Sequence, residues 1–214
     1  MRKSLAIFVL IIMMGAFWLI QQSPDTVSAV SSPTPLIVID PGHGGWDPGA
    51  VRGSVFEKSL TLDVALRLGS ALQRRGLRVY YTRSRDTALS STVLRDLTQR
   101  AATANRLGAT VFVSIHVNTE PSGTMSGPIV YYTRKSWSSY RLASLVTQNL
   151  ASSGYHHPPR PIRQWVLDVS HMPAINVEIG FLSHSGDALR MQSPQYQSLL
   201  AEWVASGIAR YLGR

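Results

Sequence analysis

From Leu36 onwards, the chain repeatedly alternates a short apolar run with a longer segment of helical periodicity. This alternation is typical of an α/β domain, in which helices pack in layers against a sheet. We therefore expect one layered sheet with helices in the intervening segments. The apolar runs predict strands at 36–40, 77–82, 111–116, 128–133 and 174–180, with a less regular sixth run at 165–169.

The segments between the runs carry apolar residues at helical spacing. In 59–75, Val64, Leu68 and Leu72 share one face, and Gly76 provides a stop signal. No internal repeat and no second domain is visible in the sequence, so we expect one domain. The same spacing predicts further helices at 92–107, 137–152 and 194–212.

The first residues of the chain bear on its compartment. Arg2 and Lys3 precede an almost wholly apolar block at 5–20, and a positive start before such a block is an export signal. The block is slightly shorter than the roughly 20 residues of a membrane-spanning helix, so a cleaved signal peptide and an uncleaved anchor both fit. We expect a signal peptide or N-terminal membrane anchor at 1–29, a linker at 30–35, and an exported domain at 36–214.

The charge balance points to an anionic environment. The chain carries 21 Lys and Arg against 12 Asp and Glu, and the cations are scattered rather than gathered into a run. Nucleic acid, an anionic wall polymer or a lipid surface can each provide that environment, but no nucleic-acid-binding motif accompanies the charge, so we expect no nucleic acid partner. The chain has no cysteine, which excludes disulfides and thiolate metal sites and leaves His, Asp and Glu as possible metal ligands.

Polar side chains follow several of the predicted strands. Asp40 and His43 come directly after the first strand, His116 closes the third, and Glu178 lies near the end of the last. Ligands of open α/β sheets bind at the carboxyl ends of the strands. We therefore expect these side chains, although far apart in the sequence, to converge on one edge of the sheet.

His43, His116, Glu57 and Glu178 together offer two imidazoles and two carboxylates, which are the donors that a catalytic zinc ion uses. Three of them make a His₂Glu set with a fourth coordination position left for water, and the remaining glutamate can carry a proton from that water to a leaving nitrogen. This division of labour predicts amide hydrolysis. Spacing alone leaves open which glutamate binds the metal, and the same donors suit other divalent metals.

Other residues near these positions have expected supporting roles. The glycines at 42, 44 and 45 allow unusual backbone angles and are expected to let a substrate come close to the metal. Asp40 is a candidate either to orient one imidazole as a hydrogen-bond acceptor or to cap a turn. Arg100, on the predicted helix 92–107, is expected to brace a loop through a carboxylate rather than to act in the chemistry.

Six sequence blocks carry a family resemblance, and they occur in order over nearly the whole of 36–214. The chain resembles the catalytic domain of the zinc-dependent N-acetylmuramoyl-L-alanine amidases of the family-3 type, the AmiC/CwlD-like cell wall hydrolases. The blocks are DPGHGG at 40–45, EK at 57–58, TRxxD at 82–86, LxxRxxxAN at 97–105, SIHVN at 114–118 and MPAINVEIGFLS at 172–183.

The resemblance implies a phosphorylase/hydrolase-like fold, a three-layer α/β/α sandwich around a twisted, mostly parallel six-stranded sheet. It implies one Zn²⁺ per chain with His43, Glu57 and His116 as its ligands, and Glu178 as the catalytic glutamate. Asp40, Asn118 and His171 are further candidates for contacts to the substrate or behind the ligands. His171 is a candidate for the cleft because it precedes the strand that bears Glu178.

The implied reaction cleaves the amide between the lactyl group of N-acetylmuramic acid and L-alanine in peptidoglycan, outside the membrane. The single-domain layout is most similar to sporulation-type amidases, which act on spore cortex, although a vegetative autolysin would look much alike. Two alternatives remain at this point: a catalytically silent wall-binding protein and a zinc peptidase that cuts within the stem peptide. A helper protein and the oligomeric state are not addressed by the sequence.

The aromatic residues Trp137, Tyr140 and Trp165 have two possible roles: they either stack on sugars or stem peptide, or they pack in the core or on the surface.

Overall fold

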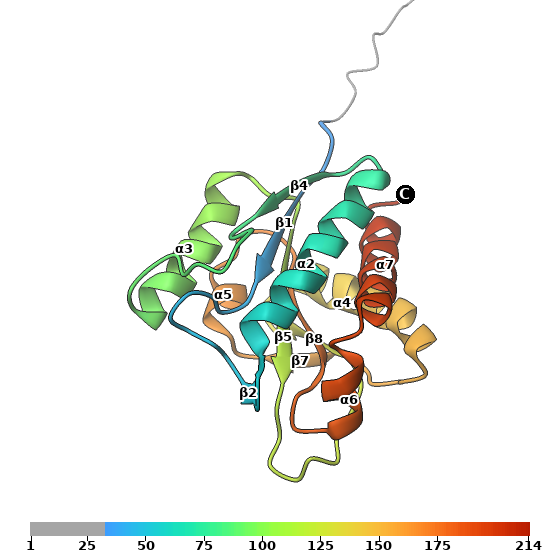
Figure 1. The fold of residues 1–214 in the computed structure, drawn as a ribbon. Coiled ribbons are helices and arrows are strands. Elements are labelled where there is room, and N and C mark those ends of the chain that lie inside the picture. The colour runs from blue at the N-terminus through green and yellow to red at the C-terminus, as the bar shows by residue number, and fades with distance from the viewer. Residues whose placement is uncertain (1–32) are drawn as a thin grey trace, which may run out of the picture. The chain divides into compact units, whose positions relative to one another are not determined.

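The computed structural model describes residues 33–214, and residues 34–214 form one compact unit. The predicted signal peptide or anchor at 1–29 and the first half of the linker at 30–35 lie outside the described residues. Within the unit, a six-stranded sheet is covered by helices on both faces (Figure 1). The predicted three-layer α/β fold is confirmed.

The sheet has the strand order β4-β1-β5-β8-β6-β7. The strands β1, β4, β5 and β8 run parallel, while β6 pairs antiparallel with β8 and parallel with β7. The sheet is thus mixed but mostly parallel, and every residue of β1 and β8 is buried. The strand bounds are β1 (Leu36–Pro41), β4 (Arg78–Tyr81), β5 (Val111–Asn118), β6 (Ile129–Thr133), β7 (Arg160–Ile162) and β8 (Ala174–Phe181).

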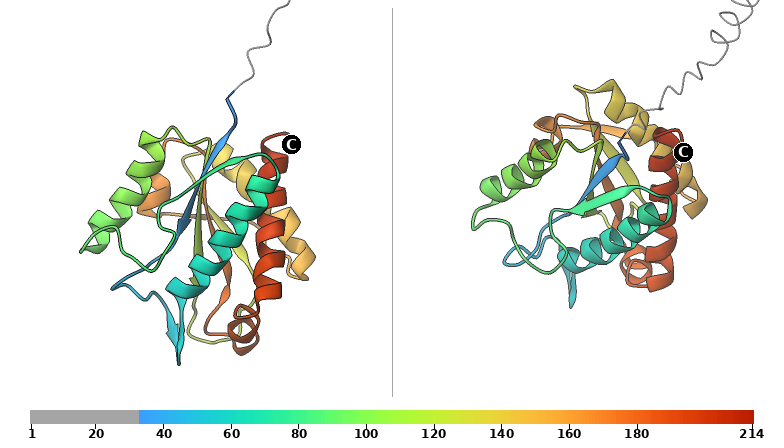
Figure 2. Two further views of the ribbon diagram at one scale, coloured as in Figure 1. Left: turned by 45° about the horizontal axis from the view of Figure 1, so that its top comes forward. Right: turned by 90° about the horizontal axis from the view of Figure 1, so that it is seen from above.

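Two helical layers of unequal size cover the sheet. On one face, α2 (Glu57–Arg74), α4 (Trp137–Leu150) and α7 (Pro194–Tyr211) pack around the larger apolar core. On the other face, α3 (Val93–Arg106) and the short α5 (Trp165–Asp168) pack around a smaller core (Figure 2). The remaining elements are α6 (Ser185–Arg190), the 3₁₀ turn η1 (Ala151–Ser153) and a hairpin of β2 (Val51–Arg52) and β3 (Val55–Phe56).

The smaller layer leaves the carboxyl ends of the strands open on the α3 face. Successive side chains of a strand point to opposite faces, so Phe112 in the smaller core places His116 on that same face. By the same alternation, Ala174 in the smaller core places Glu178 there. The strand residues of this core come from the amino halves of the strands, and their carboxyl halves therefore remain available for a site.

One predicted element is wrong, and short elements were missed. The run at 165–169 is not a strand, because Trp165–Asp168 forms α5, and the sixth strand of the sheet is β7 instead. A four-residue helix is barely one turn long and shows no helical period. The strand β7 contains Pro161, which the edge of a sheet tolerates but which disguises a strand in the sequence. The hairpin and α6 have no predicted counterpart.

Among residues 33–214, no helix combines the length and the apolar character that crossing a membrane requires.

Candidate metal centre and active site

His43 lies in a tight turn after β1. Its φ of 62° is left-handed, a conformation that costs a non-glycine residue roughly 1 kcal/mol or more and needs support from its surroundings. Two backbone hydrogen bonds between Gly44 and Asp47 close the turn. The Asp47 carboxylate then lies 2.8 Å from Nδ1 of His43, which leaves Nε2 free to face Glu57.

Glu57 is the first residue of α2, and backbone groups hold its carboxylate. Oε2 accepts a hydrogen bond from the Ala50 N–H at 2.8 Å, and Oε1 accepts one from the Val117 N–H at 2.9 Å. Burial opposes ionisation, but hydrogen bonds with His116 and His43 hold the pKa of Glu57 far below its ordinary value. The side chain is therefore a fixed, ionised acceptor at a helix N-terminus, where the helix dipole favours negative charge.

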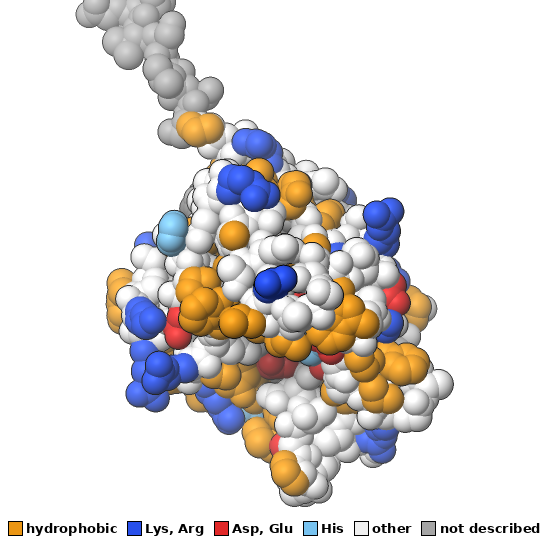
Figure 3. Space-filling model, turned by 90° about the vertical axis from the view of Figure 1, so that its left-hand side faces the viewer, with side chains coloured by type: hydrophobic (Ala, Val, Ile, Leu, Met, Phe, Trp, Pro, Cys, Tyr) orange, Lys and Arg blue, Asp and Glu red, His pale blue; other side chains and the backbone are white. Residues whose placement is uncertain are grey.

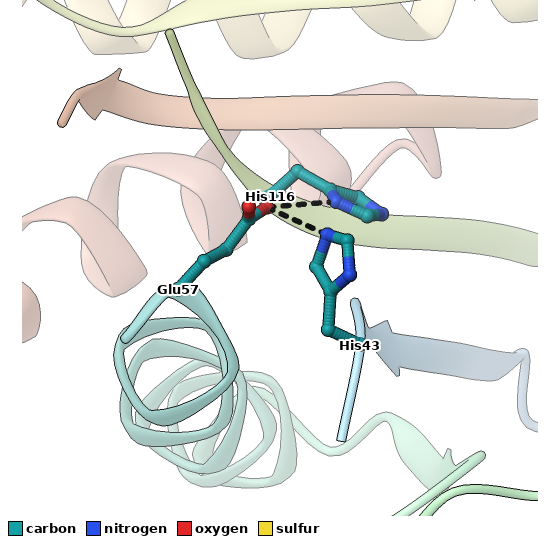
Figure 4. Close-up of side chains that lie close together, drawn as sticks. All are labelled: His43, Glu57 and His116. Carbon is teal, nitrogen blue, oxygen red and sulfur yellow. Dashed lines mark hydrogen bonds and ion pairs between the residues drawn. The ribbon is translucent and has the colours of Figure 1, made fainter. Parts of the chain in front are cut away.

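The nitrogen and oxygen donors of His43, Glu57 and His116 converge on one point (Figure 4). Nε2 of His43 lies 3.1 Å and Nδ1 of His116 lies 3.0 Å from Oε1 of Glu57, and the three donor atoms all lie within 4.8 Å of one another. Ligands of a tetrahedral zinc ion lie about 3.3 Å apart. Both imidazoles are about one-fifth exposed, at 23% and 20%, so a fourth coordination position can face solvent.

Burial and hydrogen bonding act in opposite directions on the charge of His43. Burial favours the neutral imidazole, yet hydrogen bonds to Glu57 and Asp47 raise the pKa of His43 above its ordinary value. The two negative groups that produce this shift favour the imidazolium form of His43. A divalent cation between the imidazoles and Glu57 can take over that role, since it neutralises the same carboxylate.

The glycines of the GHGG segment include two with the unusual backbone angles that the sequence predicts, φ of 126° at Gly44 and 59° at Gly45. A Cβ atom at Gly42 would lie 2.3 Å from Cε1 of His116, so its absence makes room for the second imidazole. A Cβ atom at Gly44 would lie 2.5 Å from the Thr87 carbonyl oxygen. At these positions, as at Gly45 beside Ala88, the missing side chain makes room for the chain's own atoms, and the approach of a substrate stays a prediction.

Glu178 lies beside this cluster on the neighbouring strand. It is the cross-strand partner of His116 in the pairing of β5 with β8, and it is 9% exposed. Oε1 accepts a hydrogen bond from Asn176 at 2.9 Å, while the buried Oε2 has no partner among the described protein atoms. Burial, with the nearby charge of Glu57, raises the pKa of Glu178 to about 7 against the opposing effect of His116. Such a carboxylate is suited to accept and release a proton near neutral pH.

The family match decides what kind of protein carries this arrangement. The model of the N-acetylmuramoyl-L-alanine amidase family matches residues 37–210, which include all four side chains. The chain belongs to this amidase family. It is accordingly a hydrolase of the N-acetylmuramoyl-L-alanine amidase type.

Characterised relatives and solved structures agree with the amidase fold. The germination-specific N-acetylmuramoyl-L-alanine amidase of Bacillus subtilis (strain 168) is 34% identical over 82% of this chain and 79% of its own length. The CwlD amidase from Clostridioides difficile, solved in complex with the GerS lipoprotein, has a TM-score of 0.80 at 27% identity and covers 84% of this chain and 99% of that one. The amidase from Clostridium difficile 630 has a TM-score of 0.79 at 34% identity, with 85% and 98% covered. The match covers almost the whole of both solved chains, and in this chain it corresponds to the compact unit at 34–214.

Asp40 does not touch either imidazole of the amidase. Its carboxylate is 1% exposed and accepts hydrogen bonds from Thr82 at 2.5 Å, Ser114 at 2.9 Å and Arg100 at 2.9 Å. Burial opposes its ionisation, but Arg100 and the hydrogen bonds lower the pKa of Asp40 below its ordinary value. Both predicted roles, imidazole acceptor and turn cap, are wrong; Asp47 is the carboxylate that contacts an imidazole.

Arg100 braces the histidine turn of the amidase, as expected from the sequence. Its guanidinium donates to Asp96 and Asp40, to the Pro41 carbonyl at 2.7 Å and to the His43 carbonyl at 2.8 Å. The helix α3 is thereby tied to the end of β1. These charge-assisted hydrogen bonds hold the backbone of His43 and thereby fix the point from which its imidazole extends.

The two remaining candidates, Asn118 and His171, lie at opposite edges of the sheet. Asn118 ends β5 on the open face, where its amide donates to the Tyr131 hydroxyl at 3.3 Å. His171 precedes β8 and lies at the opposite edge of the sheet, where its N–H donates to Asn105. His171 lies three residues before Ala174, the start of β8, and the strand from Ala174 to Glu178 alone spans roughly 13 Å. The expectation that His171 lines the cleft is therefore wrong.

Sequence reasoning missed two residues that shape the site. Asp47 lies four residues after His43, and an acidic residue inside the same glycine-rich turn was the available signal. Arg83 is buried and donates to the carbonyls of Pro41 at 2.9 Å and Gly42 at 2.8 Å, and its block TRxxD was the signal. Burial, together with the charge of Arg100, lowers the pKa of Arg83 to about 10, which still leaves it charged at neutral pH.

A small cleft adjoins the two imidazoles. It has a volume of about 150 Å³ and runs from His43 and His116 to an apolar wall of Trp46, Val93 and Leu97. The Trp46 indole is held in place by a hydrogen bond to the Ser90 carbonyl at 2.8 Å. Figure 3 shows a recess with acidic and histidine side chains at its floor and an apolar rim. A larger groove of about 510 Å³, between β6 and α4, lies away from these groups.

Proposed function

We propose that this amidase is zinc-dependent and cleaves the bond between the lactyl group of N-acetylmuramic acid and the L-alanine of the stem peptide in peptidoglycan. The observation that carries the proposal is the convergence of His43, Glu57 and His116 beside the unpartnered oxygen of Glu178. The donor set is the His₂Glu set of catalytic zinc sites. The glycine at 42 makes the space that the second imidazole needs.

The residues of the chain divide the work. A zinc ion held by His43, Glu57 and His116 supplies Lewis-acid activation of the scissile carbonyl and of water. Oε2 of Glu178 accepts a proton from the attacking water, and the same carboxyl then donates it to the leaving nitrogen of L-alanine. Asp47 fixes the tautomer and orientation of the His43 ring. Asn118, at the end of β5, is placed to contact the substrate.

Several features support a wall substrate and a role in spores. The predicted export signal at 1–29 would take the domain to the compartment where peptidoglycan lies. A germination-specific amidase is among the relatives, which supports spore-cortex peptidoglycan as the substrate. A solved relative binds a lipoprotein, which supports a search for such a partner here.

The test is digestion of purified cortex and vegetative peptidoglycan by residues 34–214 with zinc, followed by mass analysis of the products. The expected products are stem peptides with a free N-terminal L-alanine and glycan with free lactyl carboxylates. Cleavage within the stem peptide would identify a peptidase instead. Retention of wall polymer without products, equal in the wild type and in Glu178→Gln, would identify a silent binding protein.

A further inference from the structure

The edge of the sheet opposite the metal centre is strongly basic. We call it the amino edge, because β1, β5 and β8 all begin there. Arg78, the first residue of β4, pairs with Leu36 at this edge, and Arg106 ends α3 just before Thr110 contacts Leu36. Both arginines are exposed. Figure 3 shows cationic side chains beside the point where the described chain begins.

The C-terminal helix adds to the same edge. Arg75 contacts Ser206 of α7, so α2 and α7 run in the same direction and end together. The exposed Arg210 and Arg214 therefore lie at the amino edge, where Figure 1 places the C-terminus. Arg74 and Arg75 lie there too and share Glu202 as their ion-pair partner.

The antiparallel part of the sheet completes the basic edge. The strand β6 ends where β8 begins, so Arg134 and Lys135 follow it at the amino edge, and Arg163 follows the parallel strand β7. Arg141, in the first turns of α4, lies over the ring of Tyr211 at the end of α7. All four are exposed.

The charge balance shows how uneven the distribution is. The amino edge holds ten Lys and Arg against two acidic residues, Glu202 and Asp168. The ten cations are Arg74, Arg75, Arg78, Arg106, Arg134, Lys135, Arg141, Arg163, Arg210 and Arg214. The rest of the described domain holds nine Lys and Arg and nine Asp and Glu. The whole formal excess of positive charge in residues 33–214 therefore lies at one edge, and the remainder of the described domain, which includes the metal centre, has none.

Exposed indoles accompany the charge. Trp137, after β6, is 75% exposed, and Trp165, after β7, is 51% exposed. Tryptophan with Lys and Arg is the combination found at membrane interfaces, where the ring enters the headgroup region and the cations meet anionic lipid. A soluble polyanion can bind the cations but offers no apolar phase into which the indole rings can insert. Lipid therefore fits this edge better than a charged wall polymer.

We propose that the amino edge docks on an anionic phospholipid surface and turns the metal centre away from it, towards the wall. Thr34, where the described unit starts, lies at this edge, so the predicted signal or anchor segment 5–20 is connected on the docking side. The proposal stands on the surface of the folded unit and is independent of catalysis. Loss of amidase activity would leave it intact, and loss of lipid binding would leave the amidase function intact.

The test is sedimentation of residues 34–214 with vesicles of phosphatidylcholine alone and of phosphatidylcholine mixed with phosphatidylglycerol, at about 0.1 M salt. We expect binding to the anionic vesicles only. The variant Arg106→Gln/Arg210→Gln should weaken it about 30-fold, since each cation near such a surface contributes about 1 kcal/mol. The matched control Arg85→Gln/Arg95→Gln removes the same charge from the opposite edge and should stay within about twofold of the wild type.

Three outcomes would overturn the proposal. The first is no binding to anionic vesicles by the folded domain. The second is equal weakening of vesicle binding by the two double variants, which would mean that binding depends on the net charge of the domain rather than on this edge. The third is binding to soluble polyphosphate as tight as to vesicles, together with no effect of Trp137→Ala, which would assign the edge to a polyanion instead of a membrane.

Discussion

Replacement of Arg100 by methionine should destabilise the domain by about 3–5 kcal/mol. The substitution keeps much of the apolar stem and removes the guanidinium, so the carboxylate of Asp40, which is 1% exposed, loses its counter-charge. The carbonyls of Pro41 and His43 lose a donor at the same time. Removal of one partner of a buried ion pair costs this much because the other charge remains buried and uncompensated.

The sign of the pH dependence follows from Asp40. Its pKa is lowered in the folded protein, so its contribution to stability is present above its ordinary pKa of 3.8 and is lost as the pH falls through the folded value. Without Arg100 the folded pKa rises and that contribution disappears at neutral pH. The gap in stability between wild type and Arg100→Met should therefore narrow as the pH falls from the raised folded pKa of Asp40 in the variant to its lowered folded pKa in the wild type.

Urea unfolding followed by circular dichroism measures these differences. The variants are Arg100→Met, Asp40→Asn and the double variant, with the exposed Arg95→Met on the same helix as the control. The double variant should be more stable than Arg100→Met because the buried charge of Asp40 is removed, which leaves only Asp96 without its ion-pair partner. A loss below about 1 kcal/mol for Arg100→Met, or a double variant no more stable than Arg100→Met, would show that Arg100 does not compensate the buried charge of Asp40.

Three further predictions concern the site. Asp47→Asn should weaken zinc binding about 10–100-fold in a chelator competition, while the exposed Asp63→Asn should not, because only Asp47 orients an imidazole; equal affinities would contradict that role. Gly42→Ala should abolish zinc binding while the far-ultraviolet spectrum is kept, because the new Cβ atom occupies the space of the His116 ring; normal zinc affinity would argue against the crowding. In the metal-free protein, the raised pKa of Glu178, about 7, should make stability fall as the pH rises from about 4.5 to about 7. Glu178→Gln should lack the part of this fall in stability that Glu178 causes. A wild-type urea midpoint that stays the same across this pH range would argue against a buried, proton-binding carboxyl at Glu178.

The pattern of apolar runs in the sequence was enough to predict most strands of the sheet and the convergence of the polar side chains at their carboxyl ends. The runs at 36–40, 111–116 and 174–180 are apolar because β1, β5 and β8 are buried. Parallel strands share one carboxyl edge, so His116 and Glu178 had to meet. Glu57, at the start of a helix after an irregular loop, could be assigned only through the family resemblance.

Contacts made in three dimensions could not be predicted in the same way. The left-handed turn at His43 brings Asp47 to the imidazole in place of Asp40, and backbone angles of a turn are not visible in a hydrophobic pattern. His171 was misplaced because closeness in sequence to Glu178 was given more weight than the direction of β8. The basic amino edge was hidden because helix and strand ends far apart in the chain contribute to it.

The central claim is that three side chains bind one divalent cation and that Glu178 lies beside it without being a ligand. It is tested most directly by the zinc content of purified wild type, His116→Ala and Glu178→Gln after equilibration with excess zinc and gel filtration. We expect one zinc per chain in the wild type and in Glu178→Gln, and almost none in His116→Ala. A full complement of zinc in His116→Ala, or its loss in a folded Glu178→Gln, would contradict it.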